Sequence, residues 1–305
     1  DVTILGSAGK KDKSGDIDIG VSPNKLFPKV SQEDFYADRN KYFKELAKAL
    51  DPYVLGTKSS VGFGVIHIMF PIHDQSGKES GNNCQIDLII GESDNLAYYF
   101  HAADKPARKH TAALRNYTLD ALVGTANVIE KQGESLERYY ISPLKGLIKK
   151  TFTPKPKPNP KPKPGGPKWI PVKEEVVETN LLKGISMLTG VDPDLVMNAR
   201  DEVSSLNLVV AYLKTLPEDK RKKAYADFQW KWDGFCIKAS SETKFGDCHA
   251  YRPEMLKRFE EEFPGITQGI PGLSKDVAGN KVVAENQKDV CPTCQGDGYV
   301  VEEYI

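Results

Sequence analysis

Residues 5–21, LGSAGKKDKSGDIDIGV, carry the clearest structural pattern in this chain. Asp16 and Asp18 stand two residues apart, and apolar residues alternate with them as far as position 21. In a β-strand this alternation places both carboxylates on one face and the aliphatic side chains in the core. Two like charges at this separation repel each other, and a divalent cation between them removes that penalty. The stretch therefore predicts a strand that carries a cation site.

A third acid, Asp87, lies in residues 84–90, CQIDLII. Apolar and polar residues alternate here too, so Asp87 lies on the polar face of a second predicted strand. If the two strands are neighbours, Asp16, Asp18 and Asp87 form the three-carboxylate cluster that two-metal phosphoryl or nucleotidyl transfer requires. One metal would hold a triphosphate and the other would activate an acceptor hydroxyl.

Gly6 and Ser7 supply a candidate phosphate-binding turn. A strand that ends in Gly-Ser and enters a short helical turn leaves backbone N–H groups free, and glycine lets a phosphate approach them closely. The Ser7 hydroxyl could donate to a phosphate oxygen. Lys10 and Lys11 could neutralise the same triphosphate, although such lysines are more often solvated surface residues.

These parts together resemble the DNA polymerase β-type nucleotidyltransferase superfamily: Gly-Ser after apolar residues, a gap of eight residues, Asp-Ile-Asp, and a later apolar-Asp-apolar strand. The resemblance implies that Gly6 and Ser7 bind a triphosphate and that Asp16, Asp18 and Asp87 bind two divalent metals. GSAGKKDKSGDIDIGV, with the later RKHTAALRNYTLDALVG, is also similar to nucleotidyltransferase-like proteins encoded by bacteriophages. The competing interpretation is a Ser-Gly loop before an ordinary strand, and the joint presence of all three parts favours the resemblance.

The fold class expected from this order is α/β (α+β), a nucleotidyltransferase fold with a mixed β-sheet flanked by helices. Its domain would span residues 1–152. The runs that favour strands are residues 2–5, 17–21, 61–70 and 84–90, and those that favour helices are residues 32–50 and 106–130. The lone histidines His67 and His73 flank one of these strands and are interpreted as structural.

A Pro-Lys-rich linker, residues 153–171, follows that domain. Alternating Pro and Lys disfavours helices and sheet ladders and favours extended polyproline II. It is a semi-rigid spacer or a basic arm that touches a phosphate backbone, and both can hold. Beyond it, helix-period apolar positions predict a mainly helical domain at residues 172–286. The helical segments expected there are residues 173–188, 193–213, 218–232 and 253–263.

The C-terminal tail, residues 287–305, contains the element CxxCxGxG. Cys291 and Cys294 could chelate a structural Zn²⁺, and the element resembles half of a DnaJ-type zinc repeat. A single copy leaves two ligands unassigned. The candidates for them are Cys236, Cys248 and His249. The alternatives are a free dithiol or a zinc ion shared with a partner chain.

A basic segment at residues 108–116 offers a further candidate contact. Spacing of three or four residues places Arg108, Thr111 and Arg115 on one helical face. That face could contact a triphosphate or nucleic acid, or it could simply be solvated. No G-x-S-x-G elbow and no Walker P-loop pattern occur in the chain, which argues against covalent acyl chemistry.

Charge and composition limit the partners. The 305 residues include 42 basic and 42 acidic side chains, so the formal net charge is zero and a nucleic-acid site must be a local patch. The apolar runs fall short of the ~20 residues that span a bilayer, so no membrane partner is expected. The five scattered cysteines favour a cytoplasmic protein, in the host cytoplasm if it is phage-encoded. Because Asp1 opens the chain without a methionine, we expect an upstream helix to be missing.

The function expected is metal-dependent nucleotidyl transfer. With Mg²⁺ or Mn²⁺, a nucleoside monophosphate would pass from an NTP to the hydroxyl of an RNA end, a small molecule or a protein, releasing pyrophosphate. Two alternatives stay open: a non-catalytic nucleotide- or nucleic-acid-binding assembly protein, and a cyclic-oligonucleotide synthase. No motif indicates the base, the acceptor or the oligomeric state.

Overall fold

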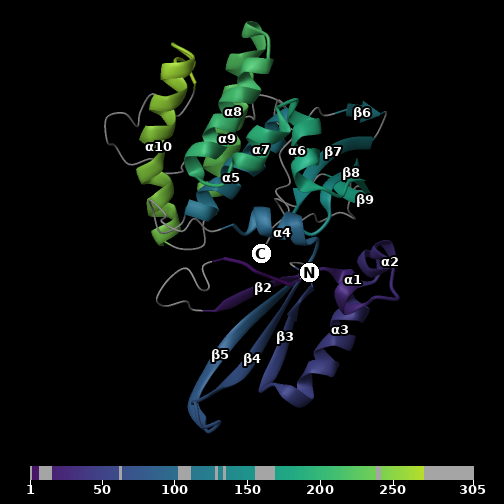
Figure 1. The fold of residues 1–305 in the computed structure, drawn as a ribbon. Coiled ribbons are helices and arrows are strands. Elements are labelled where there is room, and N and C mark those ends of the chain that lie inside the picture. Colours follow the sequence, from purple (N-terminus) through teal and green to yellow (C-terminus); the bar gives the residue numbers. More distant parts are fainter. Residues whose placement is uncertain are drawn as a thin grey trace, which may run out of the picture. The chain divides into compact units, whose positions relative to one another are not determined.

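The computed structural model describes residues 2–6, 16–61, 64–101, 111–127, 130–132, 135–154, 169–237 and 242–270 (Figure 1). The chain forms two compact units. The first unit consists of Asp1–Lys105 and Ser142–Gly146, and the second of Pro106–Ile141 and Leu147–Glu303. The units therefore divide the chain after Lys105, rather than at residue 152.

The first unit contains a five-stranded mixed sheet. Its strands are β1 (Val2–Ile4), β2 (Ile17–Val21), β3 (Gly56–Ser60), β4 (Val65–His73) and β5 (Glu79–Ile90). Their order across the sheet is β1-β2-β5-β4-β3, in which β2 and β5 are parallel and the other neighbours are antiparallel. A mixed sheet with flanking helices confirms the α/β class predicted from the sequence.

Short helices join these strands. They are α1 (Pro23–Leu26), α2 (Gln32–Ala37), α3 (Arg39–Leu50), the 3-10 helix η1 (Asp51–Tyr53) and α4 (Ser93–Tyr99). The single helix predicted at residues 32–50 is in fact two, because Asp38 adopts a non-helical backbone and its carboxylate accepts a hydrogen bond from the Lys41 N–H at 3.3 Å. Asp38 therefore ends α2 and caps the N-terminus of α3.

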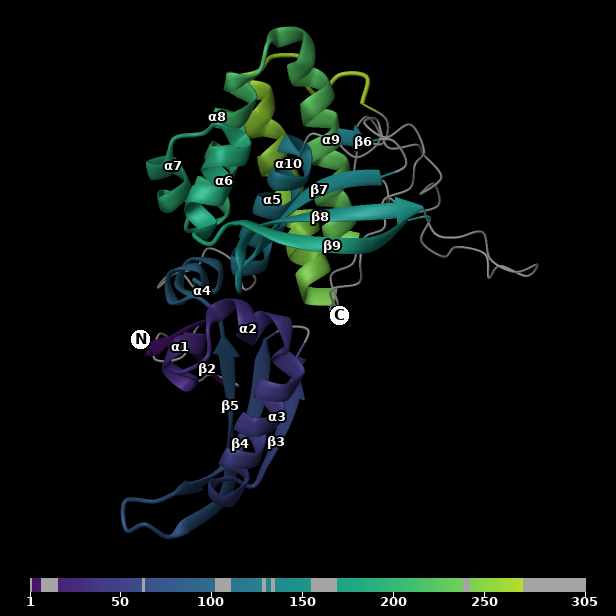
Figure 2. The same ribbon diagram turned by 90° about the vertical axis from the view of Figure 1, so that its right-hand side faces the viewer.

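One face of the sheet is the main core of the first unit. Phe35 of α2 and Phe43 of α3 are fully buried against Ile66 and Ile68 of β4 and Ile90 of β5. Figure 2 shows α3 lying along β3 and β4. Each such side chain contributes about 1.5–3 kcal/mol through burial, so this face fixes the sheet and its register.

The opposite face carries the second cluster, formed by Leu5, Ile89, Leu96 of α4 and Leu144. Because side chains alternate along a strand, Asp87 shares this face with Ile89. α4 therefore packs on the same side of the sheet as the predicted acids.

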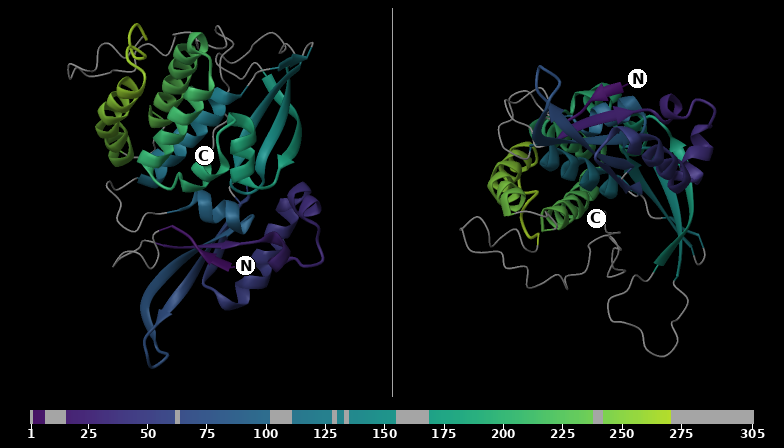
Figure 3. Two further views of the ribbon diagram at one scale, coloured as in Figure 1. Left: turned by 45° about the horizontal axis from the view of Figure 1, so that its top comes forward. Right: turned by 90° about the horizontal axis from the view of Figure 1, so that it is seen from below.

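The second unit combines a four-stranded sheet with helices. The strands are β6 (Glu130–Gln132), β7 (Ser135–Ser142), β8 (Gly146–Pro154) and β9 (Trp169–Glu178), in the order β6-β7-β8-β9. The helices are α5 (Thr111–Ala126), α6 (Leu181–Thr189), α7 (Pro193–Asn198), α8 (Glu202–Thr215), α9 (Glu218–Ile237) and α10 (Glu242–Glu262). Figure 3 shows these helices beside the sheet. From α6 to residue 270 the described residues are mainly helical, as the sequence predicted for the C-terminal part.

β9 corrects the helix predicted from residue 173. Trp169–Glu178 pair antiparallel with β8, and α6 begins only at Leu181, after Asn180 caps it. The charged residues are spaced as they would be in a helix. The β-branched valines nevertheless favour a strand, and so do cross-strand ion pairs such as the one between Nζ of Lys150 and Oε2 of Glu174, 3.7 Å apart.

The Pro-Lys segment joins two neighbouring strands of one sheet. Pro154 pairs with Trp169 in the β8–β9 ladder, and residues 155–168 lie outside the described residues. Both flanks belong to the second unit. The segment therefore connects two strands within one unit. Its composition had suggested a linker between two domains, and that prediction was wrong.

Candidate metal centre

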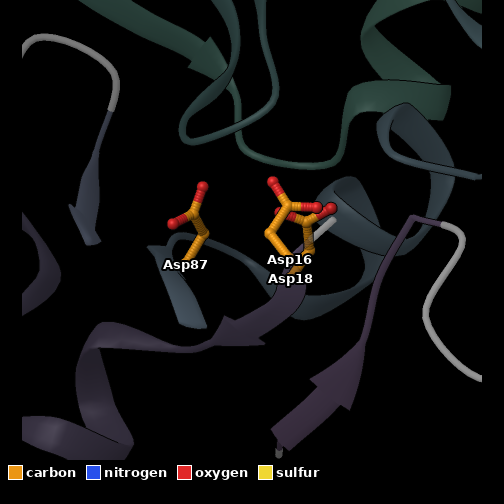
Figure 4. Close-up of side chains that lie close together, drawn as sticks. All are labelled: Asp16, Asp18 and Asp87. Carbon is orange, nitrogen blue, oxygen red and sulfur yellow. The ribbon is translucent and has the colours of Figure 1, made fainter. Parts of the chain in front are cut away.

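Strand pairing brings the three predicted acids together. β2 and β5 are parallel neighbours, and Asp18 pairs directly with Asp87 in their register. Neighbouring strands lie about 4.8 Å apart, so the two side chains stand next to each other on one face. Asp16 lies directly before Ile17, the first residue of β2. Because Asp16 is two positions from Asp18, its side chain extends to the same side of the sheet. Figure 4 shows the three carboxyl groups close together above the ends of the strands.

The cluster has dimensions that suit a divalent cation. One carboxylate oxygen from each of Asp16, Asp18 and Asp87 lies within 4.8 Å of the others. Among the described residues, no other group of three or more His, Cys, Asp or Glu side chains meets this condition. All three acids are half-buried. Carboxylate oxygens are the ligands that Mg²⁺ and Mn²⁺ take in proteins, so these residues fit such an ion.

The electrostatics of Asp18 also favour a bound cation. Burial, followed by repulsion from Asp16 and then from Asp87, raises the pKa of the Asp18 carboxyl from 3.8 to about 6. Three acids held together without a counter-ion disfavour ionisation. A divalent cation would reverse this penalty, because it favours the charged form of every carboxylate around it.

Gly6 forms a close support for Asp18. Its backbone φ is +60°, and a Cβ at this position would lie 2.5 Å from Oδ2 of Asp18. The N–H of Leu5 donates to the backbone carbonyl of Asp18 at 2.8 Å, and the N–H of Gly6 donates to that of Phe100 at 3.2 Å. Only glycine fits this turn without strain or displacement of the carboxylate. Ser7, Lys10 and Lys11 lie outside the described residues.

Asp87 has two hydrogen-bonding neighbours that the sequence did not indicate. Nδ1 of His67 lies 2.9 Å from Oδ1 of Asp87, and Nε2 of Gln85 donates to the same oxygen at 2.8 Å. Nε2 of His67 in turn lies 3.0 Å from the Ser60 hydroxyl. His67 had been interpreted as a lone structural histidine. Its place on the polar face follows from strand alternation, but its pairing with Asp87 depends on the β4–β5 register.

The basic helical face predicted around Arg115 is buried within the second unit. Arg115 is 0% exposed, and its Nε donates to the carbonyl of Ala199 at 2.7 Å. Thr111 is 5% exposed. Neither residue lies on a solvated face or on a surface open to nucleic acid, which corrects both interpretations of this segment. Arg108 lies outside the described residues.

The described residues show no zinc site. Cys236 of α9 and Cys248 of α10 are buried, whereas His249 is exposed. Burial, and then a hydrogen bond with Cys248, raises the pKa of the Cys236 thiol well above its usual range in the metal-free protein. Zinc binding by Cys291 and Cys294, which lie outside the described residues, stays a prediction.

Comparison with known proteins gives little further information. No family model matches the sequence, and no curated protein matches it. A structure of polymerase beta from Leishmania infantum, a ternary P/T complex, is similar over 61% of this chain at 14% identity, with a TM-score of 0.30. The chain matches 63% of the length of that structure. Similarity at this level establishes neither family nor activity.

The described part of the chain contains no helix that combines the length and the apolar character needed to cross a bilayer.

Proposed function

We propose that this protein is a metal-dependent nucleotidyltransferase that passes a nucleoside monophosphate from an NTP to a hydroxyl acceptor and releases pyrophosphate. The observation that carries the proposal is the convergence of Asp16, Asp18 and Asp87 from two parallel neighbouring strands to within 4.8 Å. The Gly6 turn against Asp18 adds support, because it lies where the chain enters the predicted phosphate-binding segment.

Each of these residues has a distinct part in the proposal. Asp16, Asp18 and Asp87 would hold two Mg²⁺ or Mn²⁺ ions, which supply charge neutralisation for the triphosphate and lower the pKa of the acceptor hydroxyl. Ser7 would bind phosphate oxygens through its N–H and O–H donors, and Gly6, whose own N–H donates to the Phe100 carbonyl, would let a phosphate approach closely. Lys10 and Lys11 would offset the remaining negative charge.

The reaction is a displacement at the α-phosphorus. The acceptor oxygen forms a bond to that phosphorus, the bond from it to the bridging α–β oxygen breaks, and pyrophosphate leaves with the electron pair. The acceptor hydroxyl proton passes to solvent or to a carboxylate of the cluster. An RNA end, a small molecule and a protein side chain all present a hydroxyl suited to this step.

Pyrophosphate release tests the proposal. Purified protein is incubated separately with ATP, GTP, CTP and UTP, with Mg²⁺ or Mn²⁺ and mixed RNA. It is compared with the double variant Asp16→Asn/Asp18→Asn. Loss of several kcal/mol of charge stabilisation should slow release by more than about a hundredfold. The matched control is Asp74→Asn, in the tight β4–β5 connection, which should leave release unchanged.

The outcomes separate the candidate functions. Pyrophosphate release that vanishes in the double variant supports nucleotidyl transfer. The mass of the product then distinguishes an acceptor that carries a nucleoside monophosphate from a cyclic oligonucleotide. Nucleotide binding without release under any condition would contradict the proposal and favour the assembly-protein alternative. Release that persists in the double variant would show that the three-acid cluster is not the reaction centre.

A further inference from the structure

The hydrogen bonds of Asp87 are unevenly shared between its two carboxylate oxygens. Oδ1 receives Nε2 of Gln85 at 2.8 Å and lies 2.9 Å from Nδ1 of His67. Among the described residues, no hydrogen bond ends on Oδ2. Both contacts come from the sheet itself, since Gln85 is two residues away on β5 and His67 is the β4 register partner of Asp87. The arrangement fixes one oxygen and leaves the other available.

The protonation pattern of this chain of contacts follows from the chemistry of its members. An ionised carboxylate only accepts hydrogen bonds, so Nδ1 of His67 must carry the hydrogen that it shares with Asp87. In the neutral ring, Nε2 is then an acceptor, and the Ser60 hydroxyl, 3.0 Å away, donates to it. The Asp87 carboxylate therefore fixes the tautomer of the ring, Ser60 holds its orientation, and His67 holds Asp87.

Such an arrangement is what a carboxylate metal ligand requires. A carboxylate on a flexible side chain loses rotational freedom when it binds an ion, and partners that already hold it reduce that loss. With Oδ1 held by two donors, Oδ2 of Asp87 is the oxygen that can turn to an ion shared with Asp16 and Asp18. The half-buried position of all these groups strengthens each contact relative to bulk water.

We propose that His67, held by Ser60, and Gln85 are positioning residues that orient Asp87 as a metal ligand. The inference rests on the proposed function, because it assigns a second layer to the same metal centre. His67 touches neither substrate nor metal in this account and acts only through Asp87. The competing explanation is that the three contacts only tie β3, β4 and β5 together.

Manganese binding separates the two explanations. The full chain is titrated with Mn²⁺, and free Mn²⁺ is followed by electron paramagnetic resonance. His67→Phe keeps an aromatic ring but removes both nitrogens, and it should raise the Mn²⁺ dissociation constant by about ten- to one-hundredfold, as loss of an outer partner of a metal ligand does. His67→Asn keeps an amide donor toward Asp87 and should return the constant to within about threefold of the original.

Further variants test the outer members and the specificity of the effect. Gln85→Met removes the second donor to Oδ1 of Asp87 and should weaken Mn²⁺ binding. Ser60→Ala should weaken Mn²⁺ binding less, because it removes only the hydrogen bond to Nε2 of His67 and keeps the contact between His67 and Asp87. The matched control is His73→Phe, on the same strand but exposed and opposite Glu79 in the ladder, and it should bind Mn²⁺ normally. Urea unfolding of each variant reports any loss of stability separately.

The results distinguish the failure of this inference from that of the proposed function. If the unmodified protein binds no Mn²⁺ and releases no pyrophosphate, the metal centre and the proposed function both fall. If the unmodified protein binds Mn²⁺ and His67→Phe binds it equally well, the positioning role is overturned while the metal centre stands. Weakened binding in His67→Phe that His67→Asn restores supports the positioning role, because a purely structural contact would change stability without this pattern.

Discussion

Replacing Asp18 by asparagine should stabilise the metal-free protein. Burial and the charges of Asp16 and Asp87 raise the pKa of the Asp18 carboxyl from 3.8 to about 6. At about 1.4 kcal/mol for each tenfold change in the ionisation constant, ionising this group in the folded state costs about 3 kcal/mol. The side chain is only half-buried, so screening by solvent lowers the expected gain for Asp18→Asn to about 1–2 kcal/mol.

The size of this effect depends on pH. Because the folded state holds the Asp18 proton more tightly than the unfolded state does, the favourable contribution is fully present below about pH 4. It is lost as the pH rises through about 6. Asp18→Asn is uncharged throughout, so its advantage over the unmodified protein should be largest near pH 7.5 and should disappear near pH 4.

The assay is urea unfolding in EDTA at both pH values, followed by far-ultraviolet circular dichroism and by hydrogen exchange of β5. Tryptophan fluorescence would report the wrong unit, because Trp169, Trp230 and Trp232 all lie in the second. Added Mn²⁺ at ten times its dissociation constant should stabilise the unmodified protein by about 1.4 kcal/mol. Asp18→Asn should gain much less.

Asp74→Asn is the matched control variant. A hydrogen bond from Ser76 lowers the pKa of the exposed Asp74 carboxyl, so Asp74→Asn should not stabilise the protein at pH 7.5. Asp18→Asn that is less stable than the unmodified protein in EDTA at pH 7.5 would refute the argument from repulsion. So would a difference that stays the same at pH 4.

Four further substitutions follow from the packing. Gly6→Ala, with φ of +60° and a Cβ 2.5 Å from Oδ2 of Asp18, should weaken Mn²⁺ binding and pyrophosphate release together, and unchanged values of both would contradict its supporting role. Gly184→Ala places a Cβ 2.6 Å from a side chain of β8 and should destabilise the second unit by about 1–3 kcal/mol in fluorescence-monitored unfolding. Gly234→Ala, inside α9 with nothing within 4 Å of the added Cβ, should instead stabilise that unit by about 0.5–1 kcal/mol. Leu96→Ala removes a fully buried side chain of α4 and should cost the first unit about 2–5 kcal/mol, measured by circular dichroism.

Two strand predictions, each of which depends on a single segment, could be made from the local sequence pattern and were confirmed. The alternation around Asp16 and Asp18 predicted a strand at residues 17–21, and β2 has those bounds. The alternation around Asp87 likewise predicted part of β5. The period of a strand is a property of its own backbone, so the sequence alone can show which side chains share a face.

Charged segments without a clear period were predicted less well. Residues 173–178 offered a spacing that suits a helix, yet they form β9 because β8 provides hydrogen-bonding partners and complementary charges across the ladder. The Pro-Lys segment was interpreted as a boundary from its composition, although its flanks are paired strands. Strand partners distant in sequence override local propensity.

Strand alternation in the sequence was enough to predict that Asp16, Asp18 and Asp87 lie on the polar faces of two strands, and that Gly6 precedes the first of these strands. The folded sheet was needed to show that β2 and β5 are parallel neighbours with Asp18 opposite Asp87, and that His67 and Ser60 continue the same row. The register of β4 against β5 is set by burial of Ile66, Ile68 and Ile90 against Phe35 and Phe43 on the other face of the sheet. That burial is a property of the assembled unit and of no single segment.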